Sequence, residues 1–293
     1  MAIFADENTK VVVVGLTGRQ GRYYGLLNRS YGTQVVAGVN PQKVGEDVEG
    51  IPIRASVADS VQKDGANTAF IIVPASVAGD AILEAAAGGV PFIVCVTEHI
   101  TMHRQAEVYN ILKRDYPNTR LLGPNCSGIL SPGKCNIGFT PTNVSMPGVA
   151  GIVSRSGTLA YQSVFELTQK GIGQTTCVGI GGDPVPGTSF IDCLSAFQAD
   201  PETKVVVMIG EIGGSQEEEA AEYIKREMTK PVVAYIAGVT APPGRKMGHA
   251  GAIISGSKGT AQAKMDALQS AGVRVAQNPT QLGDLAAEAL AGI

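Results

Sequence analysis

The chain has 293 residues, of which 44% are hydrophobic and 17% are charged, and its formal net charge at pH 7 is −3. This length predicts two domains that each bury a core, and the composition excludes a disordered chain. The sequence has no apolar run long enough for a membrane helix, no long basic run and no tryptophan, so we expect neither a membrane nor a nucleic acid as partner.

The N-terminal segment and the cysteines bear on the compartment. The segment MAIFADENTK carries acidic side chains where a targeting peptide would be basic. The five cysteines are scattered without a CxxC pair, which is typical of reduced thiols. We therefore expect a cytoplasmic location and no targeting peptide.

In residues 1–128, short apolar runs alternate with segments of helical character. Residues 11–15 (VVVVG) form a β-branched apolar run, typical of a buried parallel strand. Further strands are expected at 34–39, 68–73, 92–96 and 120–122, and helices at 76–87 and 102–115. Because this alternation has the spacing of βαβ units, we predict a doubly wound, Rossmann-like parallel sheet.

Ligands of such a sheet bind beyond the carboxyl ends of its strands. Gly15, Gly18 and Gly21 follow the first strand, but their spacing is not GxGxxG, and the acidic residue expected after the second strand is missing. Lys43 stands near that place, which favours a ligand with extra phosphate, such as coenzyme A (CoA) or NADP. A glycine turn that enters a helix presents N–H groups to a pyrophosphate. A Rossmann-like fold with an empty turn is the alternative.

His99 and His103 are the two histidines of this half. On a helix, a spacing of four would place both rings on one face as a metal pair, but there is no HExxH pattern. We interpret them as surface or packing histidines and expect no metal site on this chain.

Residues 129–147 differ in composition from the segments on either side. They contain Pro132, Pro141 and Pro147 and show little periodicity, which suits a linker or an ordered crossing loop. We expect the boundary between the domains near Pro147.

Residues 148–293 repeat the rhythm of the first half. Strands are expected at 149–153, 176–180, 205–209, 231–237 and 273–276, and helices at 157–170, 189–199, 215–228, 259–271 and 281–291. This pattern predicts a second α/β domain of flavodoxin-like type.

The run Ser154-Arg-Ser-Gly-Thr158 joins the first of these strands directly to a helix. Hydroxyl donors, free N–H groups and the positive end of the helix dipole meet there, which favours an anion site formed by Ser154, Ser156, Gly157 and Thr158. Helix capping alone would explain Ser156 or Thr158 individually.

Another strand ends in the run GEIGGS at residues 210–215, which contains one carboxylate, Glu211. At the same edge of the sheet, Glu211 could accept an imidazole N–H and fix the tautomer of a histidine. The acids that follow, Glu217–Glu219 and Glu222, suit the start of a helix and are expected to form a solvated face.

His249 lies in the glycine-rich stretch GRKMGHAGAIISGSKG at residues 244–259. Gly248, Gly251, Gly256 and Gly259 allow backbone conformations that other residues resist, so the imidazole could move and accept a group. The cations before it favour an anionic group such as a phosphoryl group. A solvated loop histidine without a role is the alternative.

Two known motifs, the GxSxG nucleophile elbow and the nucleotide-binding P-loop, are not present, because the residue spacing does not match either of them. Ser156 is not in a GxSxG elbow, because Ser154 occupies the place of the first glycine. The run GVTAPPGRKM at residues 238–247 is not a P-loop, because its glycines are separated by five residues and no Lys-Ser/Thr follows. Any chemistry with a nucleoside triphosphate must then be completed by another chain.

The strings GIVSRSGTLAYQ, CVGIGGDPVPG, VVMIGEIGGSQEEEAA and MGHAGAII together resemble the alpha subunits of succinate–CoA ligases (succinyl-CoA synthetases), and the resemblance extends over essentially the whole chain. It implies a Rossmann-like CoA-binding domain followed by a ligase domain with a transiently phosphorylated histidine. In this sequence that histidine is His249, its carboxylate partner is Glu211, and Ser154 to Thr158 form the helix start that holds the phosphoryl group.

The resemblance also implies the substrate contacts. Tyr161 falls on the position that contacts the carboxylic acid. The implied CoA contacts are Thr17, Gly18, Arg19, Gln20, Lys43, Val96, Thr97 and Glu98. Departures from the family pattern lie on the CoA side: Ser127 replaces a usual proline, His99 a usual glycine, acids follow Lys43 at 44–49, and Tyr23-Tyr24 is atypical.

The implied reaction is reversible. Acyl-CoA and phosphate give an acyl phosphate, whose phosphoryl group passes to His249 and then to a nucleoside diphosphate. An ATP-grasp beta subunit, in an αβ complex or its dimer, would supply the site for Mg²⁺ and for ATP or GTP. A ligase for malate or another dicarboxylate is an alternative, and so is a CoA-binding sensor without turnover. The His249, Glu211 and SRSGT set argues against a sensor, which needs no phosphoryl acceptor.

Overall fold

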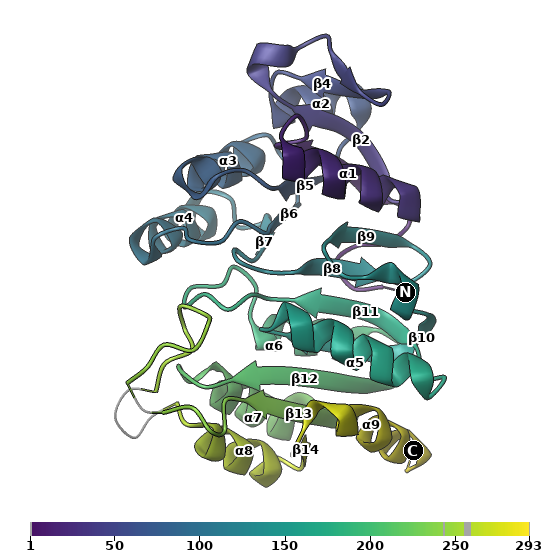
Figure 1. The fold of residues 1–293 in the computed structure, drawn as a ribbon, viewed down its shortest axis with the longest axis vertical. Helices are drawn as coiled ribbons and strands as arrows, with labels where there is room; N and C mark the ends of the chain where they lie inside the picture. The colour runs from purple at the N-terminus through teal and green to yellow at the C-terminus, as the bar shows by residue number, and fades with distance from the viewer. Residues whose placement is uncertain (1, 243, 255–258, 293) are drawn as a thin grey trace.

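The structure is a computed structural model that describes residues 2–242, 244–254 and 259–292. Gly256, predicted as one of the glycines around His249, lies outside the described residues. Strands in the described part of the chain form two seven-stranded sheets, each covered by helices, which confirms the α/β fold class. Figure 1 shows the two units one above the other, with the C-terminus in the lower one.

The first sheet is a doubly wound sheet. Its strands, in spatial order, are β3 (Asp47–Val48), β4 (Ile51–Arg54), β2 (Gln34–Val39), β1 (Lys10–Val14), β5 (Thr68–Ile71), β6 (Phe92–Cys95) and β7 (Arg120–Leu122). All neighbours are parallel except β3 and β4. Without β3, the order of the strands along the chain is 3-2-1-4-5-6, which is the Rossmann order that the sequence predicts.

The valines of β1 show why this sheet forms. Val11 and Val13 belong to one buried cluster and Val12 and Val14 to another, so the strand is covered on both faces. The covering helices are α1 (Arg19–Tyr31), α2 (Val57–Asp64), α3 (Ala75–Ala87) and α4 (Met102–Asp115). The sequence did not predict β3, β4 and α2; β4 contains a proline, which is common only in edge strands and at strand starts.

The second sheet has the flavodoxin order. Its strands are β14 (Arg274–Ala276), β13 (Val232–Ala237), β12 (Val205–Glu211), β10 (Pro147–Ser154), β11 (Gln174–Gly179), β8 (Gly128–Ser131) and β9 (Cys135–Gly138). The five strands from β10 to β14 are parallel and lie in the order 2-1-3-4-5. Their helices are α5 (Gly157–Gln169), α6 (Phe190–Ala199), α7 (Gln216–Glu227), α8 (Ala261–Ser270) and α9 (Leu282–Ala291).

The segment expected as a linker differs from its prediction. Within 129–147, β8 and β9 form an antiparallel hairpin, and β8 pairs antiparallel with β11 at the edge of the second sheet. The hairpin lies between α1 and β11 in Figure 1, and Ile129 and Ile137 join the same buried cluster as Val11 and Val153. This segment is therefore an edge extension of the sheet and not a loop throughout. Its composition is like that of a loop because short edge strands accept prolines and glycines nearby. The domain bounds 1–128 and 148–293 stay predictions.

The helices of the described residues are not of the membrane-spanning kind, since none is both long and apolar enough to cross a bilayer.

Candidate active site

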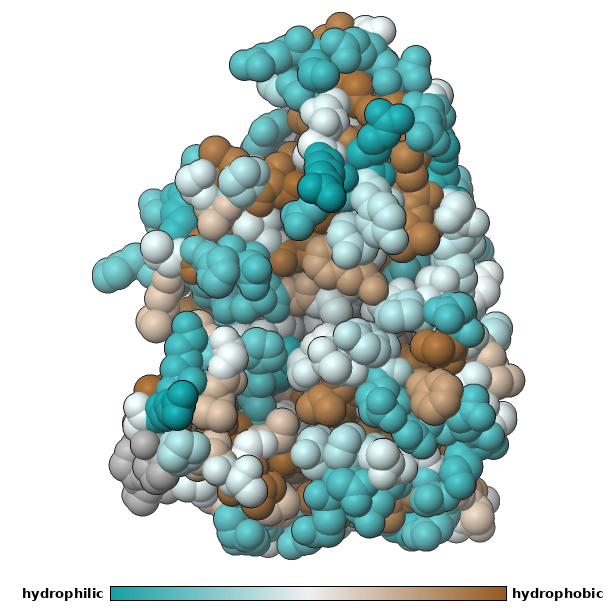
Figure 2. All heavy atoms as spheres, viewed as in Figure 1, coloured by the Kyte–Doolittle hydropathy of each residue, from teal (hydrophilic) through white to brown (hydrophobic). Residues whose placement is uncertain are grey.

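The two sheets direct their loops toward one cavity. The strand order reverses between β1 and β5 in the first sheet and between β10 and β12 in the second, and ligands bind at such points. A cavity of about 760 Å³ lies beside these two reversal points. Figure 2 shows the surface hollowed in this region, between the upper and lower units. Its lining combines residues of both units: Gly18, Arg19, Gln20, Gly21, Tyr24, Ile72, Val73, Pro74, Ala75, Val96, Thr97, Glu98, His99, Asn125, Cys126, Ser127, Phe139, Arg155, Gly157 and His249.

The start of α1 forms one wall of the cavity. Gly18 caps the helix with an extended backbone, and the first N–H groups of the helix have no intrahelical acceptor. A Cβ at Gly21 would overlap the backbone of Gly15, so this glycine allows the helix to approach the turn closely. Six of the predicted CoA residues line the cavity: Gly18, Arg19, Gln20, Val96, Thr97 and Glu98.

Two predicted CoA residues lie outside this lining. The Thr17 hydroxyl accepts a hydrogen bond from the Asn40 side chain at 2.8 Å. Lys43 belongs to the short 3₁₀ helix η1 (Pro41–Lys43), and its Nζ lies 3.5 Å from Glu46 Oε2, so one of the acids that depart from the family pattern pairs with it. Their assignment as CoA contacts stays a prediction.

The turn between β10 and α5 has the predicted strand-to-helix form. The Ser154 hydroxyl accepts from the Ser156 N–H at 3.1 Å, and the Ser156 hydroxyl caps α5 by accepting from Leu159 at 3.3 Å. These hydroxyls therefore shape the turn, while the N–H groups at Gly157 and Thr158 remain as donors for an anion.

The acid-binding prediction concerns Tyr161, one turn along α5. Its hydroxyl donates to the Thr158 hydroxyl at 3.3 Å. Neither residue is part of the cavity lining, whereas Gly157 and Arg155 are. The structure therefore brings the start of α5 to the cavity but not Tyr161.

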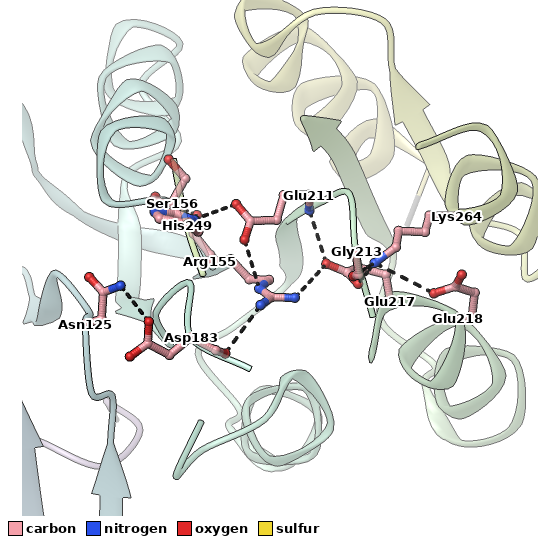
Figure 3. Close-up of polar contacts among 11 residues, drawn as sticks. Asn125, Arg155, Ser156, Asp183, Glu211, Gly213, Glu217, Glu218, His249 and Lys264 are labelled. Atoms are coloured by element: carbon pink, nitrogen blue, oxygen red, sulfur yellow. Dashed lines mark hydrogen bonds and ion pairs between the residues drawn. The ribbon is translucent and has the colours of Figure 1, made fainter. Parts of the chain in front are cut away.

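His249 and Glu211 meet as the sequence predicts. Nδ1 of His249 lies 2.6 Å from Oε2 of Glu211, and Figure 3 shows the two side chains pointing toward one another. The Glu211 side chain is 8% exposed and that of His249 is 29% exposed, so the carboxylate is buried and the ring reaches the cavity wall. The hydrogen bond to Glu211 raises the pKa of His249 above 6.5, against the opposing effect of burial.

This contact selects one chemical form of the ring. A carboxylate accepts the hydrogen of Nδ1, so in the neutral imidazole the lone pair is on Nε2. Nε2 can then act as a nucleophile toward a phosphoryl group. The ring packs on the backbone of Gly182, where a Cβ would overlap it, and Gly251 N–H donates to the Gly182 carbonyl at 3.2 Å.

Sequence reasoning missed residues that border this pair. Arg155 is 3% exposed, its Nε lies 3.4 Å from Glu211 Oε1, and it lines the cavity. Asp183 accepts from Asn125 at 2.8 Å and from Gln105 at 2.6 Å. Arg155 was visible in the SRSGT run, but no local pattern distinguishes a buried arginine from a solvated one.

The expectation of a solvated acidic face on α7 is wrong for Glu217. Its side chain is fully buried, and it lies 3.8 Å from Arg155 and in contact with Lys264. Glu219 and Glu222 are exposed as expected. Glu217 is buried because it faces the sheet from the first turn of α7, whereas Glu219 and Glu222 face solvent.

The remaining cysteine and histidine candidates for a nucleophile or a metal ligand are a buried thiol and two exposed histidines. Cys126 lines the cavity, but burial raises the pKa of its thiol well above the ordinary value, which suppresses the reactive thiolate. His99 is 83% exposed at the cavity and His103 is exposed on α4. Within the described ranges, no group of three or more His, Cys, Asp or Glu could hold a metal ion.

Known proteins resemble this chain over its whole length. It is 52% identical to a succinate–CoA ligase (ADP-forming) subunit alpha from Aquifex aeolicus, over 99% of this chain and 95% of the relative. A subunit alpha 2 of the same name from Archaeoglobus fulgidus is also 52% identical, over 99% of this chain and 100% of the relative. The chain belongs to the succinate–CoA ligase alpha-subunit family.

Family models and solved structures agree with this family membership. A CoA binding domain model matches residues 6–99 and a CoA-ligase model matches residues 153–274. The solved structure of ATP citrate lyase from Methanothrix soehngenii, in complex with citrate and coenzyme A, matches with a TM-score of 0.87 at 23% identity. The match covers 99% of this chain and 51% of that one, and at this identity the likeness shows the fold alone. The resemblance that the motifs indicate is thus confirmed at the level of the family.

Proposed function

We propose that this chain is the alpha subunit of an NDP-forming succinate–CoA ligase, in which His249 carries a phosphoryl group. The observation that supports this most is the contact of His249 with Glu211 at the wall of a cavity that the start of α1 also lines. One cavity thus combines a nucleophilic nitrogen, a helix start suited to phosphate and the loops of a CoA-binding domain.

In the direction of thioester synthesis, Nε2 of His249 takes the γ-phosphoryl group of a nucleoside triphosphate, and the diphosphate leaves. A carboxylate oxygen of succinate then attacks this phosphoryl group, which gives succinyl phosphate and frees the imidazole. The CoA sulfur attacks the acyl carbon, the thioester forms and phosphate leaves. Phosphoryl transfer depends mostly on positioning and electrostatics, which this chain provides through Glu211 and the start of α5.

We assign the remaining predicted residues to binding. Gly18, Arg19, Gln20, Val96, Thr97 and Glu98 would contact CoA, joined by Thr17 and Lys43 at the periphery. The turn of Ser154, Ser156, Gly157 and Thr158 would hold the phosphoryl group, and Tyr161 would contact the acid. Replacing succinate by malate and other dicarboxylates in the same assay tests the choice of acid.

We propose an ATP-grasp beta subunit as partner, in an αβ complex or its dimer, with the nucleotide and Mg²⁺ bound on that partner. The relatives are named as alpha subunits, which supports a heteromeric enzyme. The segment around His249 presents exposed apolar side chains at Val239, Met247 and Ile253, with Arg245 and Lys246 exposed beside them. Such a surface is suited to contact with another chain.

We infer a reducing, cytoplasm-like compartment for the chain. All five cysteines are free and buried, and burial raises the pKa of the Cys95 thiol to about 12. The structure therefore uses its cysteines as small core residues.

The test is phosphorylation of the chain co-purified with its beta subunit, using ATP or GTP labelled in the γ-phosphate. We expect acid-labile label on wild type, none on His249→Asn, and CoA binding within about twofold of wild type in that variant, because the imidazole serves transfer rather than CoA binding. His103→Asn, which changes an exposed histidine of α4, is the matched control and should keep the label. Label that persists in His249→Asn would refute the assignment.

A further inference from the structure

A buried network of charged side chains lies behind the His249–Glu211 pair. It runs from Glu211 through Arg155 and Glu217 to Lys264, and Figure 3 shows it as one connected row. The exposed fractions of these side chains are 8% for Glu211, 3% for Arg155 and 0% for both Glu217 and Lys264. The buried row contains two carboxylates and two cations, and a third carboxylate, the partly exposed Glu218, lies 3.9 Å from Lys264 Nζ at its outer end.

Glu217 connects the strand that carries Glu211 with the first turn of α7. Its Oε1 accepts from the backbone N–H of Glu211 at 3.1 Å and lies 3.8 Å from Arg155 Nη1. A Cβ at Gly210 would lie 2.5 Å from Glu217 Cγ, so the glycine leaves room for this carboxylate at the end of β12. Glu217 thereby fixes both the backbone of Glu211 and the guanidinium that faces its side chain.

Lys264 connects the same place with the segment that carries His249. It lies on α8, the first helix after that segment, and its Nζ donates to the Gly213 carbonyl at 2.6 Å and pairs with Glu217. The Gly213 N–H donates to the Gly259 carbonyl at 2.7 Å, so the turn after Glu211 is tied to both the end of the segment and the helix behind it.

Stability does not explain this arrangement. A buried ion pair contributes little net free energy, because the loss of hydration offsets the attraction, and apolar replacements are often neutral. Positioning does explain it, since Glu211 must face Nδ1 of a histidine whose segment is rich in glycine.

We propose that Glu217 and Lys264 are positioning residues for His249: they hold Arg155 and the turn at residues 211–214 so that the Glu211 carboxylate faces Nδ1. The charged groups that face His249 are Glu211 from β12, Arg155 from the turn between β10 and α5, and Asp183 from the loop after β11. Loss of the inner pair frees Arg155 to move toward Glu211 and draw its carboxylate from the ring. The catalytic consequence rests on the proposed function, but the position of the ring can be measured without turnover.

The test compares Glu217→Gln/Lys264→Met with wild type. The chain contains three histidines, so the His249 signals of ¹⁵N-labelled full-length protein can be assigned by their loss in His249→Asn. In the double variant we expect the titration midpoint of His249 to fall by about half a pH unit or more relative to wild type. In the complex, kcat should fall about tenfold while KM for CoA stays within about twofold. Glu222→Gln/Lys225→Met removes an exposed pair of charges from the same helix, and as the matched control it should change neither value.

An unchanged midpoint and kcat in the folded double variant would overturn the proposal, and so would a rise in KM that matches the fall in kcat, which indicates a structural defect. If the double variant does not fold, Glu217→Gln is measured alone, with the same outcomes, because its amide still accepts the Glu211 N–H. If the wild-type complex takes up no label, the proposed function fails, while the titration of the full chain still decides the positioning role.

Discussion

Glu211 has two opposite effects on the reactivity of His249. Its hydrogen bond raises the pKa of His249, which favours the protonated ring that cannot attack. The same bond directs the lone pair of the neutral ring to Nε2, the ring nitrogen that does not contact Glu211. Catalysis gains from this residue only if orientation outweighs the lower fraction of neutral imidazole.

This balance predicts a pH dependence. The rate of His249 phosphorylation should rise with pH through the raised pKa and level off above it, because the neutral ring is the nucleophile. In Glu211→Gln the midpoint should move down toward 6.5, and the plateau should fall at least about tenfold. Pre-steady-state labelling across this pH range measures both. An unchanged midpoint in Glu211→Gln would contradict the assigned contact.

The same shift bears on stability, with a definite sign. Because the folded-state pKa of His249 is raised, its contribution to the unfolding free energy is fully present below about 6.5 and is lost as pH rises through the folded value. Glu211→Gln should therefore cost more unfolding free energy at about pH 6 than at about pH 8. Denaturant melts at the two pH values provide the comparison.

The site residues differ in how visible they are in the sequence. His249 and Glu211 could be predicted because each follows a strand in a glycine-rich run, and such runs meet at one edge of a parallel sheet. Glu217 and Lys264 could not, since they are 47 positions apart and pair only through the fold. An acid in the first turn of a helix is also typical of a solvated position, which is why Glu217 was misread.

At the scale of elements, the strands and helices of the βαβ units were predictable and the edges of the sheets were not. Observed α4 and β2 coincide with the predicted ranges, because long periodic helices and valine-rich strands have strong local patterns. The hairpin of β8 and β9 has short strands and a proline-containing turn, and it gains its stability from pairing with β11. Such tertiary stabilisation leaves no periodic signal in the sequence.

The loop after β11 gives a steric test of the site. Gly182 has no left-handed backbone, so alanine is allowed there, but its methyl group would overlap the His249 ring. Gly182→Ala should therefore displace the ring from Glu211 and reduce phosphorylation by about a hundredfold, because small misplacements of reacting groups cost that much. In Gly79→Ala on α3 the three atoms nearest to the new methyl belong to the Arg104 side chain, away from the cavity lining, and this control should keep full activity. Rates near wild type in a folded Gly182→Ala would show that the ring acts from another position.

At the scale of the whole molecule, the two α/β units are joined through a shared core and a shared cavity. The buried cluster that contains Val13 of β1 continues to Met208 of β12, so the units pack as one body. Each sheet contributes its strand-order reversal to the cavity. Under the proposed function, CoA at the start of α1 and the phosphoryl acceptor His249 would share this cavity, so the acyl group would not pass through solvent.

This arrangement predicts that ligands protect both units at once. CoA at about 100 times its Kd should stabilise the fold by about 2.7 kcal/mol. Hydrogen exchange should then slow at residues 18–21 of α1, and also at 155–157, because both stretches line the same cavity. Inorganic phosphate alone should protect mainly 155–157, where the helix start offers its N–H groups. None of the described residues of α9 lines the cavity, so this helix serves as the internal reference. If CoA protects the first unit alone, its thiol end does not approach the start of α5, and the two half-reactions would need a larger rearrangement than this structure requires.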